Sequence, residues 1–247
     1  MTTATASDVL ATTPARRRRH LASARIHLVN LPLSLGMPWL ILGSAFVVNL
    51  IIFGMIPMDP GDARTTGGIM SIYIFALIAH ILSVTQTFPF ALGLSVTRRD
   101  FFAGLSLVIA AEAGLQGLVL TVLRAIESAT NGWGIDMTFF GVPVLVQENW
   151  FLQWVLYTVP FLALSYLAVL AGTVYKRFGQ AGMWLAIIGV VLVGGAAAVL
   201  LTWSQSWGAV GRFLVETPPL ALVAGYPAIL AVLFAGLGRL LLRRATP

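Results

Sequence analysis

Long apolar stretches constrain the fold of this chain more than any other feature of its sequence. The hydrocarbon core of a bilayer is about 30 Å thick, and a helix needs about 20 mostly apolar residues to cross it. Such stretches cover residues 37–56, 69–94, 101–123, 151–172, 182–203 and 220–242. The sequence therefore predicts an all-α membrane protein, with one domain of six transmembrane helices over residues 37–247.

The composition supports a membrane location and excludes several classes of function. Charged residues make up 10% of the chain, against about 25% in ordinary soluble domains, so a soluble enzyme is excluded. The chain has no cysteine and three histidines, which leaves little for a metal site. Its one lysine, Lys176, lies between Tyr175 and Arg177, so no phosphate-binding loop for ATP exists. We expect no enzymatic activity, bound cofactor or metal in this chain itself.

Positive charge is unevenly distributed between the segments that connect the expected spans. Basic residues concentrate in the N-terminal tail, after the second and fourth spans, and at the C-terminus. They are Arg16, Arg17, Arg18, Arg19, Arg25, Arg98, Arg99, Lys176, Arg177, Arg239, Arg243 and Arg244. Segments rich in Lys and Arg stay in the cytoplasm, so both termini are expected there, in a multi-pass protein of the plasma membrane. Topology and lipid headgroups then explain the net charge of +6, and nucleic acid is excluded as a partner.

The segment before the first span carries its own amphipathic pattern. Residues 1–15, rich in Thr and Ala, are expected to form a disordered tail. Residues 16–36 are expected to form an interfacial elbow helix, with Arg19, Ser23 and His27 on one stripe, broken by Pro32 and Gly36. The alternative is a basic, partly disordered leader. A cleaved signal is disfavoured because the apolar run that follows is long enough to span and has no small-residue cleavage site.

Four polar side chains fall inside the expected second and third spans: His80, Gln86, Glu112 and Gln116. A carboxylate in a bilayer costs a few kcal/mol, so Glu112 must pair, become protonated or face water. If the two spans form a hairpin that turns near Arg98, Glu112 lies within about 3 Å of the height of Gln86. His80 and Gln116 lie equally far from the turn. We therefore expect a polar brace between the two helices, with a substrate contact or proton-linked gate as the alternative.

Small residues and prolines indicate how the expected spans pack. Ala110 with Gly114, and Ala113 with Gly117, are spaced for close helix approach, so the third span is expected to be buried in protein. Gly182 with Ala186 and the pair Gly194–Gly195 suggest the same for the fifth span. Prolines inside three spans predict helix kinks; they are Pro89, Pro160 and Pro227.

The stretch from Phe88 to Gly104 reads FPFALGLSVTRRDFFAG. It resembles the cytoplasmic end of the second span and the following turn in the ATP-binding cassette permeases of the type-2 export family. The resemblance extends to the span count, the N-terminal elbow and the outer segment 204–219, where that family has a short outer helix. It implies that Ser95 to Phe102 form a short coupling helix that docks on a soluble ATPase subunit. Polar contacts would come from Ser95, Arg98, Arg99 and Asp100, and aromatic anchors from Phe101 and Phe102.

The same resemblance implies a function. The chain would be the transmembrane permease subunit of an exporter, paired with a second permease as a homodimer or heterodimer. Two copies of the ATPase subunit would bind ATP and Mg, and the cargo would be small and apolar, drug-like or lipid-like. The alternatives are a secondary carrier that relays protons through His80 and Glu112, or a membrane scaffold that transports nothing. The arginines and phenylalanines of the turn also fit a plain reading, as topology signals and the start of the third span.

Overall fold

The computed structural model describes residues 31–57 and 64–243, and this part of the chain is mostly helical. Its helices are α2 (Leu31–Met55), α3 (Met70–Leu82), α4 (Phe88–Gly93), α5 (Arg98–Ala129), α6 (Trp150–Trp203), α7 (Trp207–Glu216) and α8 (Tyr226–Leu242). Two short strands, β1 (Arg64–Thr65) and β2 (Met137–Thr138), pair in parallel. Within the described residues, five helical segments are long and apolar enough to cross a membrane. The predicted helical membrane architecture is therefore supported, with five candidate spans where the sequence predicted six.

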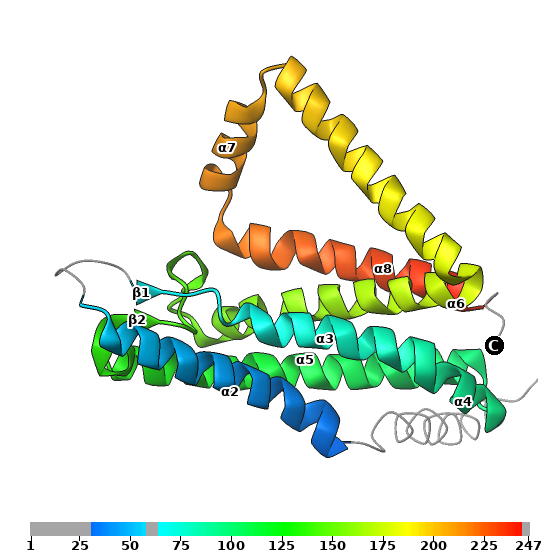
Figure 1. The fold of residues 1–247 in the computed structure, drawn as a ribbon, viewed down its shortest axis with the longest axis horizontal. Helices are drawn as coiled ribbons and strands as arrows, with labels where there is room; N and C mark the ends of the chain where they lie inside the picture. Colours follow the sequence, from blue (N-terminus) through cyan, green and yellow to red (C-terminus); the bar gives the residue numbers. More distant parts are fainter. Residues whose placement is uncertain (1–30, 58–63, 244–247) are drawn as a thin grey trace, which may run out of the picture.

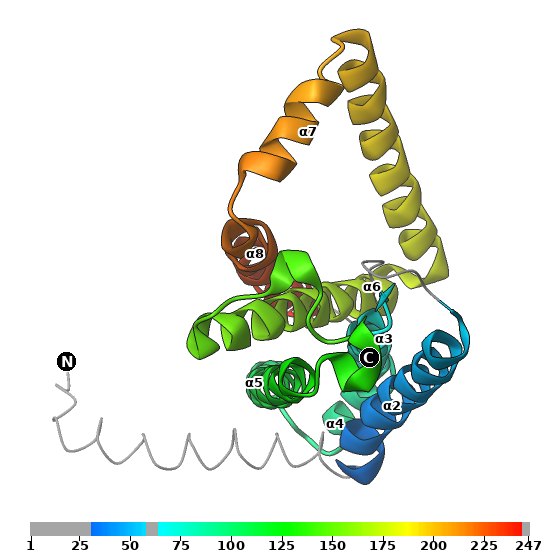
Figure 2. The same ribbon diagram turned by 90° about the vertical axis from the view of Figure 1, so that its left-hand side faces the viewer.

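The helices form a bundle around the first part of α6 (Figure 1). That part lies between α8 on one side and α3 and α5 on the other, as the end-on view also shows (Figure 2). Apolar residues fill the bundle in two clusters, one at each end. One contains Ile72, Leu120 and Phe161, and the other contains Phe88, Leu105 and Leu242. Burial of these side chains against α6 explains why the other helices align along it.

Helix α6 accounts for the difference in span count. It has 54 residues, which would measure about 80 Å if straight, more than twice the thickness of a hydrocarbon core. Gly179 interrupts it with φ 67° and ψ −164°, a conformation that is essentially restricted to glycine. The expected spans 151–172 and 182–203 both lie within α6, on either side of this residue. Beyond it, residues 180–203 leave the bundle, and α7 leads back to α8 (Figure 1).

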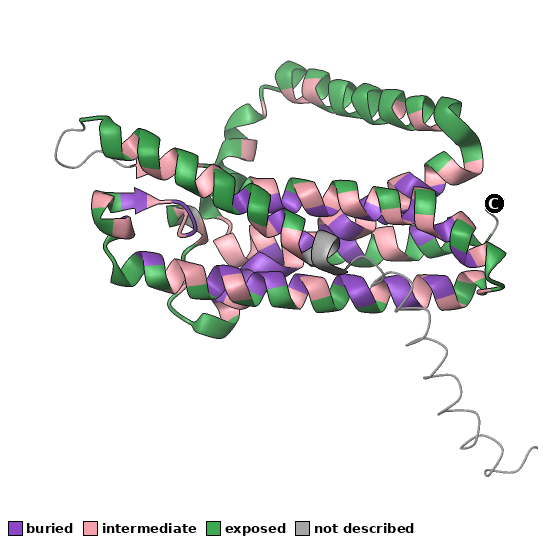
Figure 3. Ribbon diagram, turned by 60° about the horizontal axis from the view of Figure 1, so that its bottom comes forward, coloured by how far each residue is buried: buried purple, intermediate pink, exposed green. Residues whose placement is uncertain are grey.

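We call residues 180–216 the arm, since they extend away from the bundle as two exposed helical segments. Most of the arm is exposed, whereas the bundle helices alternate between buried and exposed faces (Figure 3). The helix expected within 204–219 is present as α7. The close packing expected for the fifth span is absent at Gly194 and Gly195, where a Cβ would meet no atom within 4 Å, whereas a Cβ at Gly182 would lie 2.1 Å from the Phe178 Cβ of the same element.

The third span packs as its small residues predict. A Cβ at Gly117 of α5 would lie 2.2 Å from the Thr158 hydroxyl oxygen and 3.2 Å from the Thr158 backbone nitrogen. At Gly114, the backbone carbonyl accepts a hydrogen bond from the Trp154 indole at 2.9 Å. Because glycine has no side chain at these points, the backbones of α5 and α6 come close together.

Two of the three prolines expected to kink a span lie two residues after the end of a π-helical turn. Ser83–Thr87 precede Pro89, and Ala221–Gly225 precede Pro227. A proline nitrogen has no hydrogen to donate, and its ring crowds the carbonyl four residues earlier. A widened turn relieves that crowding, which explains the position of both irregularities. Pro160 lies within α6.

The N-terminal elbow lies mostly outside the described residues, as does the tail 1–15. The break expected at Pro32 and Gly36 is not present. Helix α2 begins at Leu31 and runs without interruption through Gly36 and Pro38 to Met55. Pro38 lies inside α2.

Candidate functional site

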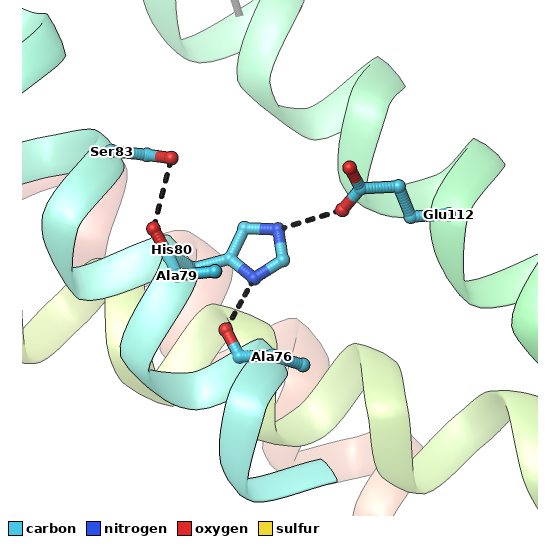
Figure 4. Close-up of polar contacts among 5 residues, drawn as sticks. All are labelled: Ala76, Ala79, His80, Ser83 and Glu112. Carbon is cyan, nitrogen blue, oxygen red and sulfur yellow. Dashed lines mark hydrogen bonds and ion pairs between the residues drawn. The ribbon is translucent and has the colours of Figure 1, made fainter. Parts of the chain in front are cut away.

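The polar side chains of α3 and α5 meet inside the bundle. His80 Nε2 lies 3.4 Å from Glu112 Oε2, and the His80 Nδ1 atom lies 2.7 Å from the Ala76 carbonyl oxygen one turn earlier (Figure 4). His80 is 4% exposed and Glu112 is 16% exposed. Of the expected brace between these two helices, the contact between His80 and Glu112 is therefore present.

The hydrogen-bond partners of His80 restrict where protons can lie. A carbonyl oxygen only accepts hydrogen bonds, so Nδ1 carries a proton and donates it to Ala76. The other nitrogen, Nε2, faces a carboxylate oxygen. If neither atom carried a proton, two lone pairs would face each other. The contact is favourable when one proton lies between them, either as an imidazolium beside a carboxylate or as a carboxylic acid that donates to a neutral imidazole.

A small cavity of about 50 Å³ adjoins the pair. Its polar lining comes from His80, Ser83, Glu112 and Gln116, and its apolar lining includes Phe161 of α6. The Gln116 side-chain oxygen is buried and accepts no hydrogen bond from the described protein. A water molecule needs roughly 10 to 15 Å³ of such space, so the cavity has room for small polar groups.

Gln86 does not belong to this cluster, although the sequence predicted it there. Its side chain is exposed. The prediction measured height from Arg98, but the helices end on either side of a non-helical turn at residues 94–97. His80 lies thirteen residues before the end of α4 at Gly93, and Glu112 lies fourteen residues after the start of α5. Heights counted from the helix ends therefore match His80 with Glu112.

Sequence reasoning missed another carboxylate, Glu127, which is buried near the C-terminal end of α5. It is 4% exposed and accepts four hydrogen bonds. The donors are the Trp133 indole at 3.1 Å and the backbone amides of Phe139 at 2.9 Å, Phe140 at 2.9 Å and Gly141 at 2.7 Å. Nothing in the local sequence pattern shows which backbone amides fold back on Glu127.

We call residues 130–146, folded over Glu127, the cap. Its aromatic side chains Phe139 and Phe140 pack with Phe46 of α2 at ring-centroid distances of 5.3 and 5.7 Å. The Tyr157 hydroxyl of α6 donates to the Phe140 carbonyl at 2.6 Å. The cap thus joins α2, α5 and α6 at this end of the bundle.

The turn between α4 and α5 differs from the expected coupling helix. Ser95 has a positive φ of 61°, and residues 94–97 form a turn. Arg98 begins the 32-residue helix α5, so Arg98 to Phe102 are its first residues. Thr97 caps this helix by accepting a hydrogen bond from the Asp100 amide at 3.1 Å. The expectation of a separate short helix over Ser95–Phe102 was therefore wrong.

The two phenylalanines of this turn lie in different environments. Phe101 is fully buried and packs edge-on against Phe88 of α4 at 5.0 Å between ring centroids. It belongs to the core, in agreement with the alternative that the phenylalanines begin the third span. A buried side chain cannot anchor a partner. Phe102 is half-buried, whereas Ser95 and Arg99 are exposed. A partner that approached this turn would therefore meet Ser95, Arg99 and part of Phe102.

The described residues contain no group of three or more His, Asp or Glu side chains placed to hold a metal ion. Comparisons with protein-family models, with curated proteins and with solved structures found no match to this chain. The function therefore has to be argued from the residues and their geometry.

Proposed function

We propose that this chain is the transmembrane permease subunit of an ATP-binding cassette exporter. The observation that carries the proposal is the stretch FPFALGLSVTRRDFFAG, which forms α4, the turn and the start of α5. It resembles the ATPase-contacting segment of type-2 export permeases, and it exposes Arg99 and Ser95 at the tip of a helical hairpin. Two ATPase subunits would supply ATP and Mg, and a second permease would complete the complex.

The proposed topology has six spans, with α6 counted as two around Gly179. Support comes from the positions of the basic residues. The α4–α5 turn, the bend in α6 and the end of α8 lie at the same end of the molecule (Figure 1). We call this the basic end, defined by Arg98, Arg99, Lys176, Arg177, Arg239 and Arg243. The positive-inside rule places this end, with both termini, on the cytoplasmic side of the plasma membrane.

The contacts between α3, α4 and α5 suggest how movement at the turn would travel. Phe88 packs on Phe101 beside the loop between α4 and α5. His80 meets Glu112 about four helical turns away from that loop. A displacement of the α4–α5 turn would therefore move both helical sides of the hairpin, α3–α4 and α5, together. In the proposed mechanism, closure of the ATPase pair tilts this hairpin and opens a path between the two permeases. The scarcity of charge in the spans favours a small apolar or lipid-like cargo.

The test is co-purification of the permease with an ATPase encoded beside it. The double variant Arg99→Ala, Phe102→Ala removes two side chains that a partner would meet, and leaves the buried Phe101 in place. The control is Arg177→Ala, Phe178→Ala, which removes a similar pair at the α6 bend, where Arg177 lies 4.9 Å from the Phe178 ring. We expect the first variant to lose at least about tenfold of the bound ATPase and the control to keep it. Equal retention by both variants contradicts the docking assignment.

A secondary carrier is the second candidate, and the His80–Glu112 pair is the observation that favours it. A carrier would work without an ATPase, whereas the permease would not. Purified chain in liposomes of defined composition distinguishes the two. Cargo movement driven by a proton gradient alone, and lost in Glu112→Gln, would support the carrier and contradict the exporter.

A further inference from the structure

Four arginines from two distant parts of the sequence converge at the basic end. Arg98 and Arg99 come from the first turn of α5, Arg239 comes from the last turn of α8, and Arg243 is the residue that caps α8. Together with Phe102 and Leu242 they line a cavity of about 70 Å³. The Arg98 guanidinium donates to the Arg243 carbonyl at 3.1 Å, which fixes the end of α8 against the start of α5.

These four guanidinium groups have no carboxylate partner within the part of the chain that the structure describes. Asp100, in the first turn of α5, accepts a hydrogen bond from Thr97 at 2.8 Å and does not line the cavity. Four like charges around one small cavity repel one another, and that repulsion is relieved by an anion. Guanidinium groups bind phosphate oxygens with paired hydrogen bonds, so the chemistry of the lining favours a phosphate.

The floor of the cavity and the adjoining surface are apolar. Leu242 is 1% exposed and packs into the core cluster with Phe101 and Leu105. Along α8, the stripe that carries Arg243 and Arg239 continues through Gly236 to Val232. Val232 is 73% exposed, and a Cβ at Gly236 would meet no atom within 4 Å. A charged rim above an exposed apolar stripe matches a molecule with a phosphate at one end and a hydrocarbon chain at the other.

We propose that this cavity binds the phosphate headgroup of an anionic phospholipid, whose acyl chain lies along the Val232–Gly236 stripe of α8. The lipid bridges the start of α5 and the end of α8, next to the turn between α4 and α5. Basic cavities between helices at the membrane surface are known to bind anionic headgroups. The site is independent of the proposed exporter function, because it needs neither the ATPase nor a cargo.

Native mass spectrometry of the full chain, purified without an ATPase, tests this proposal. The probes are phosphatidylglycerol and phosphatidylcholine, which share acyl chains and differ in net charge. We expect the wild type to retain one phosphatidylglycerol at least about tenfold more strongly than phosphatidylcholine. The double variant Arg239→Gln, Arg243→Gln should lose this preference, because each arginine near an anionic headgroup strengthens binding about fivefold, so the loss of two exceeds the tenfold preference. The matched control Lys176→Gln, Arg177→Gln removes the same charge from the same end and should keep it.

Several outcomes would overturn the proposal. Equal retention of the two lipids by the wild type would show that the cavity does not recognise the anionic headgroup. An equal loss of preference in the control would attribute the preference to the total positive charge of the basic end. Displacement of phosphatidylglycerol by millimolar inorganic phosphate would assign the cavity to a free anion. Loss of a co-purifying ATPase in Arg239→Gln, Arg243→Gln, without any lipid preference in the wild type, would assign it to acidic side chains of that subunit.

A second variant covers the case in which the glutamine double variant does not fold. Arg239→Lys, Arg243→Lys keeps the charge and removes the paired hydrogen bonds. We expect an intermediate preference for phosphatidylglycerol from this variant. A preference unchanged from the wild type would show that the guanidinium geometry has no role, and would contradict specific recognition of the headgroup.

Discussion

His80 on α3 contacts Glu112 on α5, with Nε2 and Oε2 3.4 Å apart. This contact joins the two sides of a helical hairpin inside the bundle. Removing one partner leaves the other polar group largely buried without its partner, while removing both does not. We therefore expect His80→Ala to lower the melting temperature more than the double variant His80→Ala, Glu112→Leu does. The coupling energy from the full double-mutant cycle should be about 1 to 2 kcal/mol, the upper range for polar pairs in membranes.

The matched control for this cycle is Gln86→Ala. Gln86 is a polar residue of the same expected span, but its side chain is exposed, so its removal should change the melting temperature little. A coupling energy near zero, or an effect of Gln86→Ala equal to that of His80→Ala, would mean that the pair does not stabilise the hairpin.

The Glu127 carboxylate holds the cap through four hydrogen bonds, and this predicts a second effect. In Glu127→Gln, an NH₂ group replaces one acceptor oxygen and faces backbone amides that also donate. We expect a loss of about 2 to 4 kcal/mol in stability. Hydrogen exchange should show faster exchange of the amides of Phe139, Phe140 and Gly141.

Glu148→Gln is the control for the cap, because Glu148 is an exposed acid of the same outer segment. It should leave exchange and stability unchanged. If the amides of the cap stay equally protected in Glu127→Gln, the carboxylate does not hold this segment in place.

The close approach of α5 and α6 at Gly117 gives a third prediction. An alanine there would place its Cβ 2.2 Å from the Thr158 hydroxyl oxygen and 3.2 Å from the Thr158 backbone nitrogen, so the helices must separate. We expect Gly117→Ala to destabilise the protein by about 1 to 3 kcal/mol in thermal unfolding. Gly194→Ala in the arm is the control, because a Cβ there meets nothing within 4 Å. An equal response of the two variants would contradict the packing at Gly117.

Much of the fold follows from residues that act locally. The expected spans correspond to apolar segments of the structure, and Gly117 predicted the close approach of α5 because small residues at helical spacing have direct geometric consequences. The direct succession of the fourth and fifth spans in α6 was not predictable from hydropathy. The two helical parts of α6 meet at one glycine, Gly179, whose φ and ψ are not helical.

The candidate site could be predicted only in part. His80 and Glu112 were expected in one cluster because a carboxylate in the membrane needs a partner, and they are in contact. Gln86 was misplaced because the hairpin turn at residues 94–97 shifts the heights of the two helices. The positions of Glu127 under the cap and of Arg239 and Arg243 beside Arg98 depend on tertiary contacts that one sequence does not display.

The bend at Gly179 gives the last prediction. Its φ of 67° and ψ of −164° lie in a region essentially restricted to glycine, and a Cβ there would meet no atom within 4 Å. The cost of Gly179→Ala is therefore one of backbone conformation, about 1 to 3 kcal/mol. The variant can relieve it by adopting helical angles, which would straighten α6.

Spin labels can measure this straightening, because the chain has no cysteine of its own to compete with introduced ones. Labels at Phe151→Cys and Val199→Cys occupy exposed positions on the two parts of α6. In a straight helix they would lie about 72 Å apart along the axis, so Gly179→Ala should move the measured distances toward that value or lower the melting temperature. Gly189→Ala, also in α6 with open space around it, should do neither. Unchanged distances and stability in Gly179→Ala would show that neighbouring contacts, and not the glycine, set the bend.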